Sequence, residues 1–440
     1  MPFVTSRAVG QRALLRQRNR NTDPDRKAVS PALAVGRSMV TLQTRIETLC
    51  SSTENVDRTD ISALQPAVNA FMTVTAEQAI EEARAADRDL DSGNWRGPLH
   101  GIPVAIKDFY DTAGVRTTAA YAHFKNRVPS KDAVAVAKLR SAGAIIVGKT
   151  NMHTLGTGTT GLESCFGPVR NPWNARCVPG GSSGGSAVAV ATGMCYATLD
   201  SDAVGSCRLP AACCGVVGFK GTYGLISMQG ILDGEQLPDE YLLWMAHAGI
   251  TSRRVRDTAL MLDVLAERDS ATGPPAFAAT LDESRKLRLG IGANCKPPPA
   301  GAGIFEAALK TLRSLGHEII ETEVPLVELD SATVARIKDD RRDIRARVFK
   351  HIDAYVLPTT PTTTPTVGEC RKNALSLSPA YTSFANYYGL PAISVPCGFD
   401  PLVLPVGLQF VAPADGDALV LQVAHQYESA TSWTHYRPPQ

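Results

Sequence analysis

Three side chains of this protein have the types needed for nucleophilic catalysis. Residues 179–186 form a block of glycine and serine that contains Ser182, a further serine follows at Ser206, and Lys107 ends an apolar run upstream. Glycine clusters occur where a backbone turns sharply or approaches another group closely, so this block would hold its hydroxyls in fixed directions. A serine hydroxyl becomes a nucleophile only beside a base. The three residues together could therefore supply a nucleophile and its base.

Lysine is the candidate base because no histidine stands in a motif-like setting. His153, beside a glycine-rich stretch, is expected to be a core or loop residue. The apolar run 102–106 predicts a buried strand, and desolvation at its end would lower the pKa of Lys107. A structural lysine paired with a carboxylate such as Asp108 is the alternative, and residue type alone favours that alternative.

The elements that would position these residues alternate between helix and strand. This alternation predicts an α/β fold, an α/β/α sandwich with a central mixed, mostly parallel twisted sheet surrounded by helices. Helices are expected at 34–50, 74–92, 131–142, 186–198, 252–267, 304–315 and 379–388. Strands are expected at 102–106, 144–147, 286–292, 317–324, 354–358, 392–396 and 406–411.

The bulk composition is that of an ordinary globular protein. The chain has 440 residues, of which 45 are Lys or Arg and 43 Asp or Glu, so its net charge of +2 makes no electrostatic case for nucleic acid or a membrane surface. No apolar run approaches the roughly 18 residues of a membrane span. Residues 1–30 are locally basic without the apolar core of a signal peptide. They are expected to form a poorly ordered or loosely docked tail of a cytoplasmic protein.

Two glycine patterns imitate nucleotide-binding motifs. Residues 143–150 match the Walker A string, but the four central residues, Ala-Ile-Ile-Val, predict a buried strand instead of a phosphate-binding loop. The stretch 156–161 matches GxGxxG, yet no acidic residue follows at the distance a dinucleotide site requires. It is interpreted as a loop that lines a cleft, with Gly156, Thr157 and Gly158 as substrate contacts. No cofactor is expected, and the scattered cysteines and histidines predict no metal site.

Beyond these single residues, the chain resembles the amidase signature family over most of its length. The similarity is carried by GIPVAIKD at 101–108, PGGSSGGSAVAVATG at 179–193, the segment 205–227 and NYYGLPAISVPCGFD at 386–400. In that family the nucleophile stands 24 residues after the first serine of the serine pair, and the residue at that distance from Ser182 is serine. The resemblance implies an amide-cleaving enzyme.

The resemblance also implies the domain organisation. After the tail at 1–30, residues 31–440 would form a single amidase signature domain. Its core signature region would lie at about 95–265 and its C-terminal part at 286–440.

The family's catalytic roles can be carried over to matching residues. Ser206 resembles the nucleophile, Ser182 the bridging serine that follows a cis peptide bond at Gly181, and Lys107 a base that is uncharged in the resting enzyme. Four backbone N–H groups would form the oxyanion hole, those of Ala203, Val204, Gly205 and Ser206. Three further residues would support the site: Ser183 in the loop, and Asp202 and Arg208 as a buried pair that fixes the turn.

The chain departs from the family pattern in three places. Val204 stands where a glycine is usual, which would narrow the acyl side of the pocket. The segment 228–248 is longer than usual, and its apolar cluster, with Tyr241 and Trp244, is either a lid over the substrate or ordinary core packing. The region between 325 and 354 is shorter than usual, which suggests a more open cleft.

These features predict a hydrolase of an amide, an anilide or a carbamate, with a bulky apolar substrate such as an aryl amide or urethane. It would act as a monomer or homodimer on a small molecule, without nucleic acid or membrane. The alternative from another class is the glutaminase (A) subunit of a tRNA-dependent amidotransferase, which needs protein partners. A catalytically inactive scaffold is disfavoured because Lys107, Ser182 and Ser206 are all present.

Overall fold

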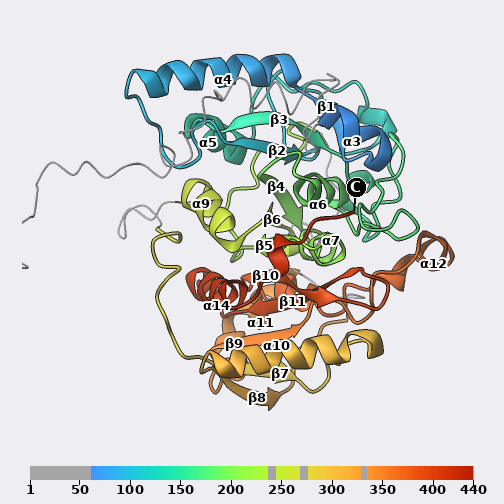
Figure 1. Cartoon of the computed structure of the whole chain (residues 1–440), viewed down its shortest axis with the longest axis vertical. Helices are drawn as coiled ribbons and strands as arrows, with labels where there is room; N and C mark the ends of the chain where they lie inside the picture. The colour runs from blue at the N-terminus through green and yellow to red at the C-terminus, as the bar shows by residue number, and fades with distance from the viewer. Residues whose placement is uncertain (1–60, 236–243, 268–275, 329–333, 440) are drawn as a thin grey trace, which may run out of the picture. The chain divides into compact units, whose positions relative to one another are not determined.

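The computed structural model describes residues 61–235, 244–267, 276–328 and 334–439. The predicted tail at 1–30, the predicted helix at 34–50 and Tyr241 lie outside these ranges. The described residues form one sheet of 11 strands with helices on both faces (Figure 1). The predicted α/β sandwich is therefore confirmed.

The strands follow the order β1-β3-β2-β4-β6-β5-β10-β11-β9-β7-β8 across the sheet. Their bounds are β1 Phe71–Val74, β2 Pro103–Lys107, β3 Ile145–Thr150, β4 Ala197–Asp202, β5 Val217–Lys220, β6 His247–Ser252, β7 Arg288–Gly292, β8 Glu318–Thr322, β9 Ala354–Pro358, β10 Ala392–Phe399 and β11 Pro405–Val411. The string that imitates a Walker A motif ends in β3, whose residues are all buried. Its interpretation as a strand is confirmed.

The sheet is mixed, but the prediction that it is mostly parallel is wrong. Four neighbouring pairs are parallel, β2 with β3 and β4, and β7 with β8 and β9. Six pairs are antiparallel, among them β4–β6, β5–β6 and β10–β11. Antiparallel neighbours need only a short turn, as between β10 and β11, whereas parallel ones need a crossover. The other five antiparallel pairs join strands separated by longer stretches of chain, and alternation of helix and strand does not reveal which strands become neighbours.

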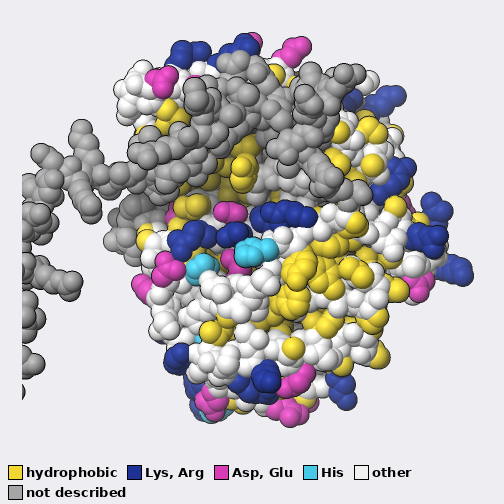
Figure 2. Space-filling model, viewed as in Figure 1, with side chains coloured by type: hydrophobic (Ala, Val, Ile, Leu, Met, Phe, Trp, Pro, Cys, Tyr) yellow, Lys and Arg dark blue, Asp and Glu magenta, His cyan; other side chains and the backbone are white. Residues whose placement is uncertain are grey.

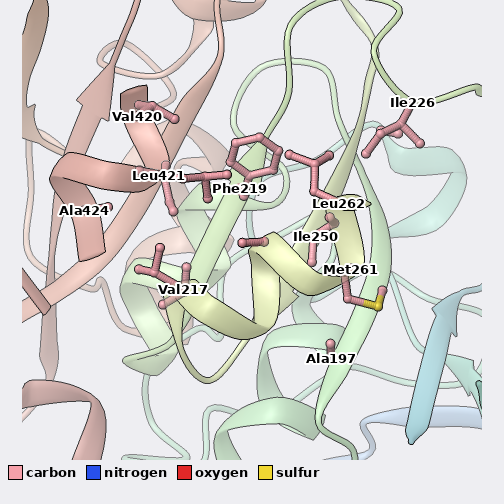
Figure 3. Packing of buried hydrophobic residues seen from close by; sticks show 14 of the residues in the cluster. Ala197, Val217, Phe219, Ile226, Ile250, Met261, Leu262, Val420, Leu421 and Ala424 are labelled. Carbon is pink, nitrogen blue, oxygen red and sulfur yellow. The ribbon is translucent and has the colours of Figure 1, made fainter. Parts of the chain in front are cut away.

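Two sets of helices cover the two faces of the sheet. Their bounds are α3 Ile61–Val68, α4 Ala76–Asp91, α5 Val134–Ser141, α6 Gly184–Thr192, α7 Arg208–Cys214, α9 Val255–Leu265, α10 Ala302–Ser314, α11 Val334–Val348, α12 Val367–Lys372, α13 Ser383–Tyr387 and α14 Asp417–Ser429. Helices α5, α9, α10 and α14 share one hydrophobic core with the sheet, and α4, α6 and α7 share another. In the first core, Phe219 of β5 lies with Leu262 of α9 and Leu421 of α14 (Figure 3).

The described surface carries both signs of charge. Lys and Arg side chains are interspersed with Asp and Glu side chains on the face that Figure 2 shows. Exposed ion pairs such as Arg256–Asp282 and Arg313–Glu306 join them, with N···O distances of 3.0 and 2.9 Å. None of the described helices is long and apolar enough to cross a membrane.

Candidate active site

Lys107 is the last residue of β2, a strand in which every residue is buried. Its Nζ donates to Ser182 Oγ at 2.7 Å and to Ser201 Oγ at 2.9 Å. Burial lowers the pKa of Lys107 to about 8, although the nearby Asp200 carboxyl group opposes that shift. A lysine with such a pKa is partly uncharged near neutral pH and can accept a proton. The first link of the predicted relay is therefore present.

Ser182 stands in the glycine-serine block directly before α6. The peptide bond between Gly181 and Ser182 is cis, as the resemblance implied. A Cβ atom on Gly181 would lie only 2.7 Å from the backbone nitrogen of Gly161, so the block packs against the loop at 156–161. The close packing of two glycine-containing segments places the Ser182 hydroxyl within reach of Lys107.

Ser206 lies between the end of β4 and the start of α7, and only 3% of its surface is exposed. Its carbonyl oxygen accepts the Ser183 N–H at 3.1 Å, which ties the nucleophile segment to the glycine-serine block. The Ser183 hydroxyl donates to the Ser201 carbonyl at 3.3 Å. Among the described residues no hydrogen bond joins the Ser182 and Ser206 hydroxyls. The second link of the relay stays a prediction that these backbone contacts support.

The turn before Ser206 is expected to offer four N–H groups to an oxyanion. The Gly205 N–H already donates to Asp202 Oδ1 at 2.7 Å, and the Cys207 N–H donates to Asp202 Oδ2 at 3.1 Å. The N–H groups of Ala203, Val204 and Ser206 donate to no acceptor within the described part of the chain. These three remain the candidates for oxyanion donors.

The predicted pair of Asp202 and Arg208 is present and fully buried. Arg208 Nη2 and Nε donate to the two oxygens of Asp202 at 2.9 and 3.0 Å. Asn386 also donates to Asp202, and Arg208 Nη1 donates to Gln409 Oε1 at 2.7 Å. Burial raises the pKa of Asp202, but Arg208 and Asn386 outweigh it and hold that pKa well below its usual range. The carboxylate therefore stays charged and fixes the turn that carries Ser206.

Gly156, Thr157 and Gly158 lie in the loop beside the relay. A Cβ atom on Gly156 would sit 3.7 Å from Ser182 Oγ, whereas one on Gly158 would overlap the His153 ring. The Thr157 hydroxyl donates to the Thr154 carbonyl at 3.0 Å on an exposed part of the loop. This geometry places Gly156 nearest to the relay, and contact of all three with substrate stays a prediction.

Val204 and Trp244 pack against the same hydrophobic cluster, which includes buried residues of α11, β9 and α13. The Trp244 ring stacks on Tyr223 with 5.4 Å between centroids, and Lys338 Nζ lies 4.5 Å from its centre. Trp244 thus has packing partners from other elements. Residues 236–243 of the predicted lid, which include Tyr241, lie outside the described residues.

Three polar residues of the site are absent from the sequence-based prediction: Ser201, Thr382 and Asn386. Ser201 binds Lys107, the Thr382 hydroxyl donates to the Val204 carbonyl, and Asn386 binds Asp202. The position of Ser201 next to Asp202 is the only signal that could have drawn attention to it. Within the described ranges, no three His, Cys, Asp or Glu residues could hold a metal ion.

A buried lysine that donates to a serine hydroxyl, in a block tied by a backbone hydrogen bond to the segment of a second serine, is the arrangement expected of serine hydrolases of the Ser–Ser–Lys class. Comparison with known proteins identifies the family. The family model described as Amidase matches residues 57–338 and 329–421. The chain belongs to the amidase signature family and is a hydrolase of C–N bonds.

Named relatives extend this result. The (A) subunit of glutamyl-tRNA(Gln) amidotransferase from Geobacter metallireducens is 34% identical over 454 residues, which cover 85% of this chain and 92% of that protein. The crystal structure of the same subunit from Thermotoga maritima has a TM-score of 0.69 at 30% identity, covering 84% and 90% of the two chains. Peptide amidase from Stenotrophomonas maltophilia has a TM-score of 0.70 at 28% identity, covering 86% and 93%.

Proposed function

We propose that the chain cleaves a carboxamide through an acyl-enzyme on Ser206, with Ser182 and Lys107 as the proton relay. The observation that carries the proposal is the 2.7 Å hydrogen bond from buried Lys107 to Ser182. The contact of Ser183 with Ser206 holds the two serine segments together. A hydroxyl that is otherwise inert thus has a base within reach through one intermediate group.

The chemistry follows from this arrangement. Lys107 accepts the proton of Ser182 while Ser182 accepts the proton of Ser206, and Ser206 Oγ bonds to the amide carbon. The oxyanion that forms is stabilised by the backbone N–H groups of Ala203, Val204 and Ser206, because the Gly205 N–H already donates to Asp202. The relay then returns its proton to the leaving nitrogen, and the C–N bond breaks. Water attacks the acyl-enzyme by the same route, which releases the carboxylic acid and restores Ser206.

The substrate class is a choice between two hypotheses. The bulky aryl amide or urethane expected from the sequence rests on a lid whose central residues, 236–243, lie outside the described residues. The alternative, a glutaminase subunit of a tRNA-dependent amidotransferase, is supported by the amidotransferase subunit that is 34% identical over 85% of this chain. We therefore favour the side-chain amide of glutamine as substrate and other protein subunits as partners.

Active-site labelling tests the mechanism. A fluorophosphonate probe should modify Ser206, and Ser206→Ala should abolish both the label and amide hydrolysis. Ser314→Ala is the matched control, because Ser314 lies exposed on α10 and should leave labelling unchanged. A label on another residue, or full activity of Ser206→Ala, would overturn the proposal.

A substrate panel tests the substrate class. Glutamine, other primary amides, anilides and carbamates are compared by product release, with and without the partner subunits of a tRNA-dependent amidotransferase. Hydrolysis of glutamine that increases with those subunits would support the favoured hypothesis. Efficient cleavage of an anilide or carbamate, with glutamine untouched, would favour the bulky apolar substrate instead.

A further inference from the structure

A second acidic group lies beside the relay, and the mechanism above gives it no role. Asp200 is fully buried in β4, the parallel neighbour of β2. Because Ile106 pairs with Leu199, the next residues along the two strands, Lys107 and Asp200, share one face of the sheet. Helix α6 covers this face and shields the two side chains from solvent.

The two carboxyl oxygens of Asp200 differ in their hydrogen bonds. The hydroxyls of Thr198 and Thr251 both donate to Asp200 Oδ2, each at 2.7 Å. Asp200 Oδ1 is buried and accepts no hydrogen bond of ordinary geometry from the described residues, while, against the larger effect of burial, the nearby Ser186 hydroxyl of α6 lowers the pKa of the carboxyl group. A carboxylate with one bare oxygen in a buried site is poorly stabilised, so its charged form depends on nearby positive charge. The cation of the relay, Lys107, is the group that can supply it.

We propose that Asp200 is a positioning residue of the relay, whose carboxyl group sets how much of Lys107 is uncharged and able to accept the Ser182 proton. The inference rests on the proposed function. An anionic Asp200 stabilises the ammonium form of Lys107, so less of the lysine is in the amine form that can accept a proton. A protonated Asp200 does not, so the amine form becomes more populated.

The pKa directions agree with this geometry. Burial raises the pKa of Asp200, whereas burial lowers the pKa of Lys107 to about 8. The two groups can therefore carry one proton between them, either on the amine or on the carboxyl group. The pair has no net charge in either arrangement, and the exchange requires no other reactant.

The other titratable groups near Asp200 are less able to play this part. The Tyr110 hydroxyl donates to the Asp200 carbonyl at 2.7 Å, and Cys207 Sγ contacts the Thr251 hydroxyl at 3.3 Å. Burial raises the pKa of Tyr110, Cys207 and Cys195, so these groups stay uncharged. Asp202 is already paired with Arg208. Asp200 is thus the group here whose charge can change.

The test is the rate at which a fluorophosphonate probe labels Ser206, measured against pH for the whole chain. Asp200→Asn removes the negative charge, so the midpoint of the acid limb should fall by about one pH unit or more. The rate at the alkaline plateau should match the wild type, because Lys107 is uncharged there in both proteins. Asp108→Asn is the matched control. Asp108 is a buried carboxyl group of the same region, but the lysine that acts on its pKa is Lys149. This variant should leave the midpoint unchanged.

A second pair of variants protects the test against misfolding of Asp200→Asn. Thr251→Val removes one donor to Asp200 Oδ2, disfavours the carboxylate and should lower the midpoint by a smaller amount. Thr251→Ser keeps the donor and should restore the wild-type profile. An unshifted midpoint in both Asp200→Asn and Thr251→Val, or a shift to higher pH, would overturn the inference. Absence of Ser206 labelling in the wild type would instead overturn the proposed function.

Discussion

The chemistry of this site depends on the protonation state of one residue. Lys107 has no exposed surface, and its ammonium group faces two serine hydroxyls instead of a directly paired carboxylate. Burial penalises the charged form, which explains why a lysine can act as a base near neutral pH. Pairing of Lys107 with Asp108 is not observed, because the Asp108 side chain accepts from the Thr118 hydroxyl at 2.6 Å and forms no ion pair with Lys107. A structural lysine beside another carboxyl group stays the alternative to the proposed base.

The pH dependence of acylation follows from this state. The folded pKa of Lys107 lies below the ordinary lysine value, so the amine form that accepts a proton grows as the pH rises through about 8. The labelling rate of Ser206 should therefore rise through the same range and then level off. A rate that falls as the pH rises toward 8 would contradict the assignment.

Removal of the base is a separate prediction. Lys107→Ala should slow acylation by about 10²- to 10⁴-fold, the usual contribution of a general base. Lys310→Ala is the control, because Lys310 is exposed on α10 and should keep the wild-type rate. Single-turnover labelling kinetics measure the acylation rate of both variants. A mild effect of Lys107→Ala would mean that another group is the base.

At the scale of elements, the glycines of α6 allow close packing against neighbouring backbone as well as a sharp turn of the chain. Gly185 donates its N–H to the Asn151 carbonyl at 3.0 Å. A Cβ atom on Gly185 would lie 2.7 Å from Asn151 N and would overlap the Ala70 carbonyl as well. The first turn of α6 therefore touches the backbone beside β1 and β3, and Ser182, just before this turn, lies at the end of β2 where Lys107 stands.

Two glycine substitutions should have opposite effects on stability. Gly185→Ala should destabilise the fold by about 1–3 kcal/mol, because overpacking outweighs the gain in helix propensity. Gly303→Ala in α10 has open space around the new methyl group and should stabilise by up to about 1 kcal/mol. Urea unfolding measures both, and stabilisation by Gly185→Ala would mean that the close contact relaxes at no cost.

Several elements are predictable because their signal is local. The strand at 102–106, the strand in the Walker A imitation and the helix at 304–315 correspond to β2, β3 and α10. The mostly parallel sheet is not observed, since strand order depends on which hydrophobic faces pair across long sequence separations. In addition, β6 at His247–Ser252 has no counterpart among the predicted strands, and the helix expected at 252–267 begins only at Val255.

At the scale of the whole described structure, one polar network joins distant parts of the chain. Arg208, at the start of α7, binds Asp202, Asn386 of α13 and Gln409 of β11. Strand β5 pairs with β10, so the core signature region and the C-terminal part share one sheet. This pairing supports the proposal of a single domain for the part of the chain that the structure describes, from residue 61 onward.

Removal of the central arginine should weaken this structure strongly. Arg208→Ala leaves the Asp202 carboxylate buried without its partner, which costs about 3–5 kcal/mol of unfolding free energy. Arg288→Ala breaks a half-exposed pair with Asp353 and should shift the urea midpoint much less. Equal effects of the two variants would contradict the structural role of the Arg208 network.

The sequence by itself determined which chemical groups the proposed mechanism uses. Lys107, Ser182 and Ser206 were predicted from residue type, spacing and family resemblance, because these signals lie in short segments. Only the tertiary structure decided what surrounds them. Ser201 and Asp200 come close to Lys107 because β4 pairs with β2, and Asn386 reaches Asp202 because α13 folds back beside the site. Such contacts depend on strand order and long-range packing, which no local pattern encodes.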